Sequence, residues 1–189
     1  MFNYLKYYIK KTLAMVGILH PSLGIKIRPE EKATILLQYK TPDMVTFVET
    51  GTENGWMIKK IGDKFEQVYS VEINQNLYRQ ARERFQDKTQ IELLLGDSAV
   101  EIKKILLEIN EPALFWLDAH GSGEITSTNA PIIKELEAIF AHSIRGHNIL
   151  IDDARHFDRE TIKLMKKMTK LHNYTFVIKD GIFRLVSKM

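Results

Sequence analysis

Acidic side chains follow short apolar runs along this chain of 189 residues, at spacings that suit the recognition of a ligand. The first apolar run, 45–49, leads into a turn whose residues 49–55 read Glu-Thr-Gly-Thr-Glu-Asn-Gly. In such a turn Gly51 permits a tight bend that brings the backbone close to a ligand, and Gly55 permits the following helix to pack closely against the strand. This pattern predicts a ligand-binding turn, with a purely structural turn as the alternative.

Two further acidic positions follow the next two apolar runs. Glu72 ends the run 67–72, about twenty residues after the glycine turn, where a carboxylate can accept hydrogen bonds from ribose hydroxyls. Asp97 follows the run 91–95 and a glycine, where its side chain could accept from an adenine amino group while backbone amides at Asp97 and Ser98 meet the ring. Helix capping is the alternative role for Asp97, with Ser98 as the rival cap, and we expect Ser98 to cap the helix that follows. The spacing favours a ligand that contains adenosine.

These segments resemble the motifs of the class I S-adenosylmethionine-dependent methyltransferases, from about Met44 to the C-terminus. The resemblance implies that Glu49 holds the amino group of the methionine moiety and that Glu72 holds the ribose. The donor is a sulfonium cation, for which carboxylates at strand ends are suitable neighbours. The residues that the resemblance assigns to cofactor binding are Glu49, Gly51, Thr52, Gly55, Glu72, Asp97, Ser98 and Asp118.

One position departs from the pattern of that family, because Glu53 stands where the central glycine of the first motif is familiar. A similar loss occurs in the metal-dependent O-methyltransferases that look like catechol O-methyltransferase. The departure therefore indicates a subfamily, and it leaves the conformation of the loop open. Glu53 would also repel the pyrophosphate of a dinucleotide, which disfavours a nicotinamide-dependent dehydrogenase.

Three more carboxylates follow the fourth and fifth apolar runs. Asp118 ends the run 113–118, and Asp152 and Asp153 follow the next one. Neighbouring parallel strands end at the same edge of a sheet, so we expect the three to meet and to offer oxygen ligands for Mg²⁺. Catechol-type O-methyltransferases bind their metal with an Asp and an Asp-Asn pair at these strand ends, and macrocin-type sugar O-methyltransferases also use acidic residues there. In the alternative, Asp118 lines the cofactor pocket and the other two are turn or cap residues.

A histidine near this edge could remove a proton from a methyl acceptor. His120 lies two residues after Asp118, and an imidazole near its ordinary pKa accepts a proton at neutral pH. We therefore predict catalytic roles for His120 and Asp118, with His156 as the second candidate base and an ordinary surface histidine as the alternative. The segment before residue 42 and the loop 121–129 are expected to form a lid that excludes water.

The elements that must position these residues alternate along the chain. Short β-rich apolar runs and longer amphipathic segments predict an α/β, Rossmann-like, doubly wound sheet covered by helices on both faces. We expect seven strands, at 45–49, 67–72, 91–95, 113–118, 148–152, 174–178 and 182–186. We expect helices near 30–39, 55–62, 75–85, 98–109, 131–141 and 158–171.

The connection between the last two strands distinguishes between families with this pattern. Only Asp180 and Gly181 join them, and a two-residue Asp-Gly turn forces an antiparallel hairpin. The sheet is therefore mostly parallel with a reversed C-terminal strand, as in the methyltransferases that the sequence resembles. The sheet of the usual dinucleotide dehydrogenase is parallel throughout.

The residues before this pattern, 1–41, are expected to form an N-terminal helical extension, followed by one S-adenosylmethionine-binding domain over 42–189. Lysines interrupt the apolar residues of 1–19, so no transmembrane span is expected there. We expect that segment to form a helix packed on the domain. The alternatives are a signal peptide and a basic, aromatic helix on a membrane surface or a partner.

Composition narrows the function classes. The formal net charge of +3 is spread along the chain and does not favour a nucleic acid partner. The absence of cysteine excludes disulfides and thiolate zinc sites and suits a cytoplasmic protein. We therefore expect a methyltransferase that uses S-adenosylmethionine, with Mg²⁺ assistance, to methylate a small-molecule hydroxyl. A nicotinamide-dependent oxidoreductase and a non-catalytic cofactor-binding protein are the alternatives, and a homo-oligomer remains open.

Overall fold

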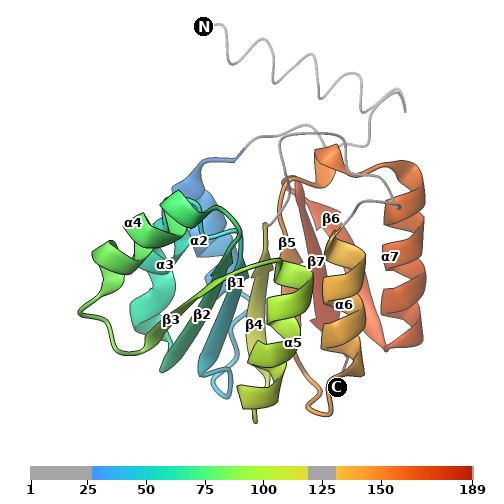
Figure 1. Cartoon of the computed structure of the whole chain (residues 1–189). Helices are drawn as coiled ribbons and strands as arrows, with labels where there is room; N and C mark the ends of the chain where they lie inside the picture. The colour runs from blue at the N-terminus through green and yellow to red at the C-terminus, as the bar shows by residue number, and fades with distance from the viewer. Residues whose placement is uncertain (1–26, 119–130, 189) are drawn as a thin grey trace, which may run out of the picture.

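The structure is a computed structural model that describes residues 27–118 and 131–188. Its centre is a seven-stranded sheet with the strand order β3-β2-β1-β4-β5-β7-β6 (Figure 1). The strands are β1 (Thr46–Thr50), β2 (Gln67–Glu72), β3 (Ile91–Leu95), β4 (Ala113–Leu117), β5 (Asn148–Ile151), β6 (Tyr174–Lys179) and β7 (Ile182–Ser187). The helices are α2 (Pro29–Leu37), α3 (Trp56–Ile61), α4 (Gln75–Phe85), α5 (Ser98–Glu108), α6 (Pro131–Ala141) and α7 (Arg159–Leu171), with short 3-10 turns η1 (Gly62–Lys64) and η2 (Ala154–His156). The predicted α/β fold and its seven strands are confirmed.

The strand directions also confirm the predicted hairpin. The β1, β2, β3, β4 and β5 neighbours pair in parallel, whereas β7 pairs antiparallel with both β5 and β6. Asp180 and Gly181 both have positive φ, 56° and 74°, as a tight two-residue hairpin turn requires. The reversed strand lies inside the sheet, because β7 inserts between β5 and β6 and leaves β6 at the edge.

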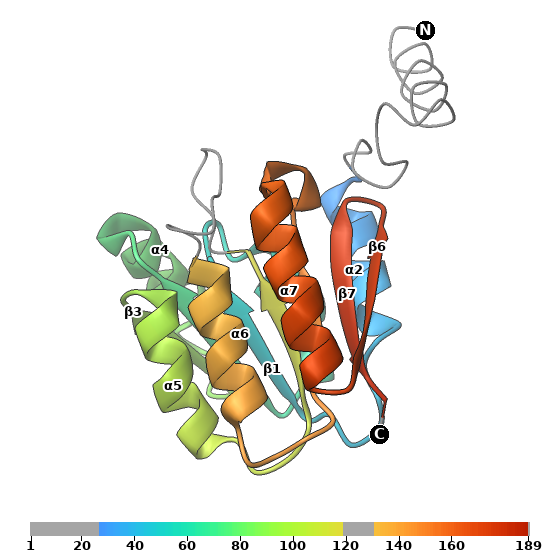
Figure 2. The ribbon, with the colours of Figure 1, turned by 90° about the vertical axis from the view of Figure 1, so that its right-hand side faces the viewer.

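Successive side chains along a strand point to opposite faces of the sheet, and they form two apolar cores, one on each face. Phe47 packs with residues of α2, α3 and α4, whereas its neighbour Val48 packs with residues of α5 and α6. Figure 2 shows α5, α6 and α7 side by side on one face, with α2 beyond the sheet on the other. The predicted domain boundary at residue 41 falls after α2, whose Ala33 and Leu36 lie in the same core as Phe47.

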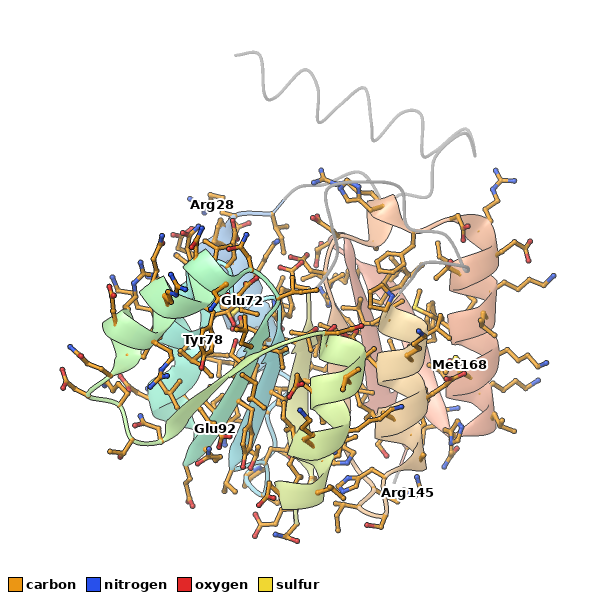
Figure 3. The ribbon with its side chains drawn as sticks, viewed as in Figure 1. Arg28, Glu72, Tyr78, Glu92, Arg145 and Met168 are labelled. Carbon is orange, nitrogen blue, oxygen red and sulfur yellow. The ribbon has the colours of Figure 1, made fainter. Side chains whose placement is uncertain are left out.

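The chain order of the strands creates a point at which their direction of progress reverses. From β1 the chain moves to β2 and β3 on one side, and it then returns to place β4 on the other side of β1. Ligands of open α/β sheets bind outside the carboxyl ends of the strands at such a point. Glu72 lies toward this carboxyl edge, and Arg145 lies at the opposite edge of the molecule (Figure 3).

One predicted helix cap is wrong. Asp97, not Ser98, is the N-cap of α5, with extended backbone angles and a side chain that accepts a hydrogen bond from the Ala99 amide at 2.9 Å. Ser98 is already the first residue of the helix. Both residues have good capping side chains, so the backbone conformation at Asp97 decides between them.

The predicted N-terminal helix over 1–19, the lid loop 121–129 and His120 lie outside the described residues. Within 27–118 and 131–188, no helix combines the length and the apolar character needed to cross a membrane.

Candidate ligand and acceptor site

The turn after β1 is held in a left-handed path by three residues. Gly51, Glu53 and Gly55 have φ values of 88°, 47° and 63°, a region that favours glycine. Glu53 therefore adopts a backbone conformation that glycine favours. The Gly51 and Thr52 amides donate to the Val71 carbonyl at 2.9 and 3.2 Å, which ties the turn to β2.

Gly55 serves a different neighbour from the one predicted. A Cβ atom at this position would lie 2.5 Å from the ring of Phe85, which belongs to α4. The absent side chain thus lets α4, rather than the strand, pack closely against the start of α3. The sequence pattern identifies a close contact here but not the partner, because α4 follows only after β2.

Glu49 is a buried carboxyl at the end of a chain of hydroxyl groups. Ser70 Oγ donates to Glu49 Oε2 at 2.6 Å, and Thr52 Oγ1 lies 2.7 Å from Ser70 Oγ. Burial raises the pKa of Glu49 to about 8, the Ser70 hydrogen bond opposes this effect, and the charges of Glu72 and Glu53 add to it. A neighbouring cation would stabilise the ionised carboxylate.

Glu72 ends β2 and organises the loops on either side of it. Its two oxygens accept from the backbone amides of Glu53 and Asn74, each at 2.8 Å. Glu72 lies two residues after Ser70, whose hydroxyl donates to Glu49, so the two carboxyl groups lie on the same face of the sheet. The next residue, Ile73, is 75% exposed.

A second buried carboxyl lies on the opposite face of the sheet, near the start of α5. Glu135 of α6 is fully buried, and within the described residues neither of its oxygens has a hydrogen-bond partner. The Thr50 hydroxyl at the end of β1 is also buried without a partner there. Burial raises the pKa of Glu135 to about 7, and the Ser98 and Thr50 hydroxyls, which lie nearby but outside hydrogen-bonding geometry to its oxygens, oppose this effect.

Asp118 and Asp152 meet at the carboxyl edge, as predicted, because the parallel ladder continues past the strands. The Asp118 amide donates to the Thr50 carbonyl at 2.9 Å, and the Asp152 amide donates to the Leu117 carbonyl at 3.1 Å. Burial, followed by the charge of Asp152, raises the pKa of Asp118 to about 8. Burial also raises the pKa of Asp152.

A lysine that the sequence analysis did not single out completes this group. Lys32 of α2 forms an ion pair with Asp152, and only 19% of the lysine side chain and 3% of the aspartate side chain are exposed. Burial lowers the pKa of Lys32, but the carboxylates of Asp152, Asp118 and Asp153 raise it above its ordinary value. The two paired residues are 120 positions apart in the sequence, so no local pattern links them.

Asp153 adjoins this group through its amide, but its side chain is paired with an arginine. Its backbone is left-handed, with a φ of 48°, and its side chain pairs with Arg155 at 3.3 Å. In the parts of the chain that the structure describes, no group of three or more histidine or acidic side chains could hold a metal ion. The donor set predicted for Mg²⁺ therefore does not fit, because a lysine ammonium contacts Asp152 and Asp153 engages an arginine.

Among the described residues, His156 lies near the carboxyl edge of the sheet and His147 lies at the opposite edge. His156, the second candidate base, accepts a hydrogen bond from Arg155 Nε at 3.1 Å and lies in η2, near the carboxyl edge. His147 lies at the opposite edge, where its Nδ1 accepts from the Ala113 amide at 3.0 Å and its Nε2 contacts His142 Nδ1 at 2.9 Å. Burial lowers the pKa of His147 to about 4, which suits a structural imidazole that stays neutral.

Comparisons with known proteins identify the fold but not the methyl acceptor. No family model matches the sequence, and no curated protein matches it. The structure is similar to an rRNA methylase from Streptococcus thermophilus, with a TM-score of 0.60, 14% identity, and coverage of 86% of this chain and 98% of that one. It is also similar to the N-methyltransferase NodS from Bradyrhizobium japonicum in complex with S-adenosyl-L-homocysteine, with a TM-score of 0.58, 13% identity, and coverage of 85% and 87%.

A third similar structure is a Staphylococcus aureus protein provisionally assigned as a caffeoyl-CoA O-methyltransferase. Its TM-score is 0.58 and its identity 13%, and the match covers 96% of this chain and 91% of that one. At such identities the likeness shows a Rossmann-like methyltransferase fold. The three neighbours are named for different methyl acceptors.

Proposed function

We propose that this chain is an S-adenosylmethionine-dependent methyltransferase. The observation that supports this most is the pair of carboxyl groups, Glu49 and Glu72, that flank the left-handed turn after β1 at the switch point of the sheet. S-adenosylmethionine carries a sulfonium and an ammonium group, and both are attracted to such carboxylates. A dinucleotide pyrophosphate would instead be repelled, so the site favours the sulfonium ligand.

Each residue around the turn binds a different part of S-adenosylmethionine. Glu49 accepts from the amino group of the methionine moiety, and Thr52 supports it through Ser70. Glu72 accepts from the ribose hydroxyls, because a carboxylate offers about four acceptor positions and the loop amides take two of them. Ile73 contacts the adenine ring, and Asp97 accepts from its amino group through the oxygen that does not cap α5.

The solved structures support this ligand by analogy. NodS, which has the same fold, holds S-adenosyl-L-homocysteine, the product that remains when S-adenosylmethionine gives up its methyl group. Fold alone does not determine function, so the carboxyl groups of this chain carry the proposal and the neighbour adds to it.

We further propose that the acceptor is a hydroxyl group of a small molecule. In the transfer, the acceptor oxygen forms a bond to the methyl carbon while the bond from that carbon to sulfur breaks, and the hydroxyl proton passes to His120. Asp118 lines the acceptor side of the ligand, where burial keeps water away and alignment of the reacting atoms supplies most of the rate gain. No step is assigned to Mg²⁺, since the donor set does not fit that ion.

Isothermal titration calorimetry with S-adenosylmethionine and with NAD tests the ligand. We expect saturable binding of S-adenosylmethionine by the wild type, a loss of at least tenfold in affinity for Glu49→Gln, and no change for Glu92→Gln, whose side chain is exposed on β3. Binding of NAD without binding of S-adenosylmethionine would overturn the proposal.

A screen of hydroxyl compounds with methyl-labelled donor then tests the reaction. Label transfer to a small-molecule oxygen supports the proposed acceptor class. Binding of the donor without transfer to any acceptor would favour a non-catalytic cofactor-binding protein, and transfer to RNA would replace the small-molecule acceptor.

A further inference from the structure

We propose that the ammonium group of Lys32 is the resident cation of the acceptor side of the site, in the place for which the sequence alone predicts Mg²⁺. The consequence for methyl transfer rests on the function proposed above, whereas the cation role itself can be tested without it. In this role Lys32 neutralises the carboxylates that line the site and orients the acceptor.

The position of Lys32 is built by the fold. It lies in the first turn of α2, and its neighbours in the helix, Ala33 and Leu36, are buried in the core against β1 and β4. The helix begins near the carboxyl edge, where Arg28 lies (Figure 3). This packing aims the lysine side chain at the ends of β4 and β5 and leaves it largely covered.

Both oxygens of Asp152 are already used. Oδ2 pairs with Lys32 Nζ, and Oδ1 accepts from the Asp153 amide at 2.7 Å. A divalent ion at this carboxylate would have to displace the lysine, and the two cations would repel each other if both remained. Asp153 pairs with Arg155, so two of the three carboxylates expected to hold the ion already have cationic partners.

A fixed ammonium group can perform the electrostatic part of the task of a metal ion. It offsets the negative charge of two buried carboxylates, which would otherwise repel each other, and its remaining N–H groups can donate to the oxygen of an acceptor. An acceptor hydroxyl beside Lys32 would thus be oriented without a metal. We infer that methyl transfer by this chain is independent of divalent cations and that the acceptor is held partly by α2.

A titration with Mn²⁺ tests the cation role of Lys32. Binding is monitored by calorimetry and by the electron paramagnetic resonance signal of the free ion. We expect no saturable binding to the wild type. The Lys32→Met variant keeps the apolar stem and removes the charge, so it should gain one Mn²⁺ per chain. The double variant Lys32→Met, Asp152→Asn should lose that gained binding, and Lys32→Arg should behave as the wild type.

Two results would overturn the cation role of Lys32: saturable Mn²⁺ binding by the wild type, or a folded Lys32→Met variant that binds no Mn²⁺. If Lys32→Met does not fold, the wild type and Lys32→Arg decide, and binding of Mn²⁺ by either contradicts the inference. If neither the wild type nor Lys32→Arg binds Mn²⁺, the effect of EDTA on methyl transfer decides. Transfer that persists in EDTA supports the cation role of Lys32, and transfer abolished by EDTA overturns it. Calorimetry with S-adenosylmethionine is a separate readout, so failure of the proposed function would be recognised independently.

Discussion

Replacement of Glu135 by glutamine should stabilise the protein at alkaline pH. Glu135 is fully buried in α6, and neither of its oxygens has a hydrogen-bond partner in the described parts of the chain. Glutamine has nearly the same shape but no charge to lose or gain. The carboxyl group is therefore tolerated in its neutral form and is costly when it ionises.

The magnitude follows from the pKa. Burial raises the pKa of Glu135 from an ordinary 4.5 to about 7, so the folded protein binds more protons than the unfolded chain between these values. The free energy of unfolding of the wild type therefore falls as pH rises through this window. The full difference is on the order of 3 kcal/mol, because each pKa unit corresponds to about 1.4 kcal/mol. For a chain of this size that equals roughly 6–12 °C in unfolding temperature.

Urea denaturation of the wild type and Glu135→Gln, measured at pH 5 and at pH 8, checks this prediction. At pH 8 the variant should be more stable by about that amount, and at pH 5 the two should differ much less, because Glu135 is then largely neutral in the folded protein. Glu137→Gln is the matched control, since Glu137 is exposed on the same helix. A stability difference that is the same at both pH values, or a less stable variant at pH 8, would refute the reasoning.

Three other predictions concern the turn and the opposite edge. Because burial raises the pKa of Glu49 to about 8, binding of S-adenosylmethionine at pH 7 should release a proton, seen in calorimetry as a heat that depends on the buffer and is absent in Glu49→Gln. Glu53→Gly should raise the free energy of unfolding by about 1 kcal/mol in urea denaturation, since it relieves a left-handed backbone; a lower stability would contradict this. His147→Ala should lower the free energy of unfolding by about 1–3 kcal/mol in urea denaturation, because the Ala113 amide loses its acceptor. Unchanged stability would show that this hydrogen bond is unimportant.

The sequence by itself determined the elements and the edge of the sheet at which the candidate carboxyl groups lie. Strong periodicity and clear turn residues mark each strand and helix, and the bounds of β2, β3, α4 and α6 match the predicted ranges. The Asp180–Gly181 turn determines a hairpin because both of its residues tolerate positive φ. The predicted meeting of Asp118 with Asp152 follows from the rule that neighbouring parallel strands end at one edge of a sheet.

Only the tertiary structure decided which distant partners these elements acquire. The insertion of β7 beside β5 depends on a pairing that no turn residue encodes, and the contact of Gly55 is with α4 rather than with a strand. Lys32 reaches Asp152 because α2 packs on the core, and Asp153 pairs with Arg155. Local propensities act over a few residues, whereas these contacts join segments that meet only when apolar faces are buried, so the cation of the acceptor side is a property of the fold.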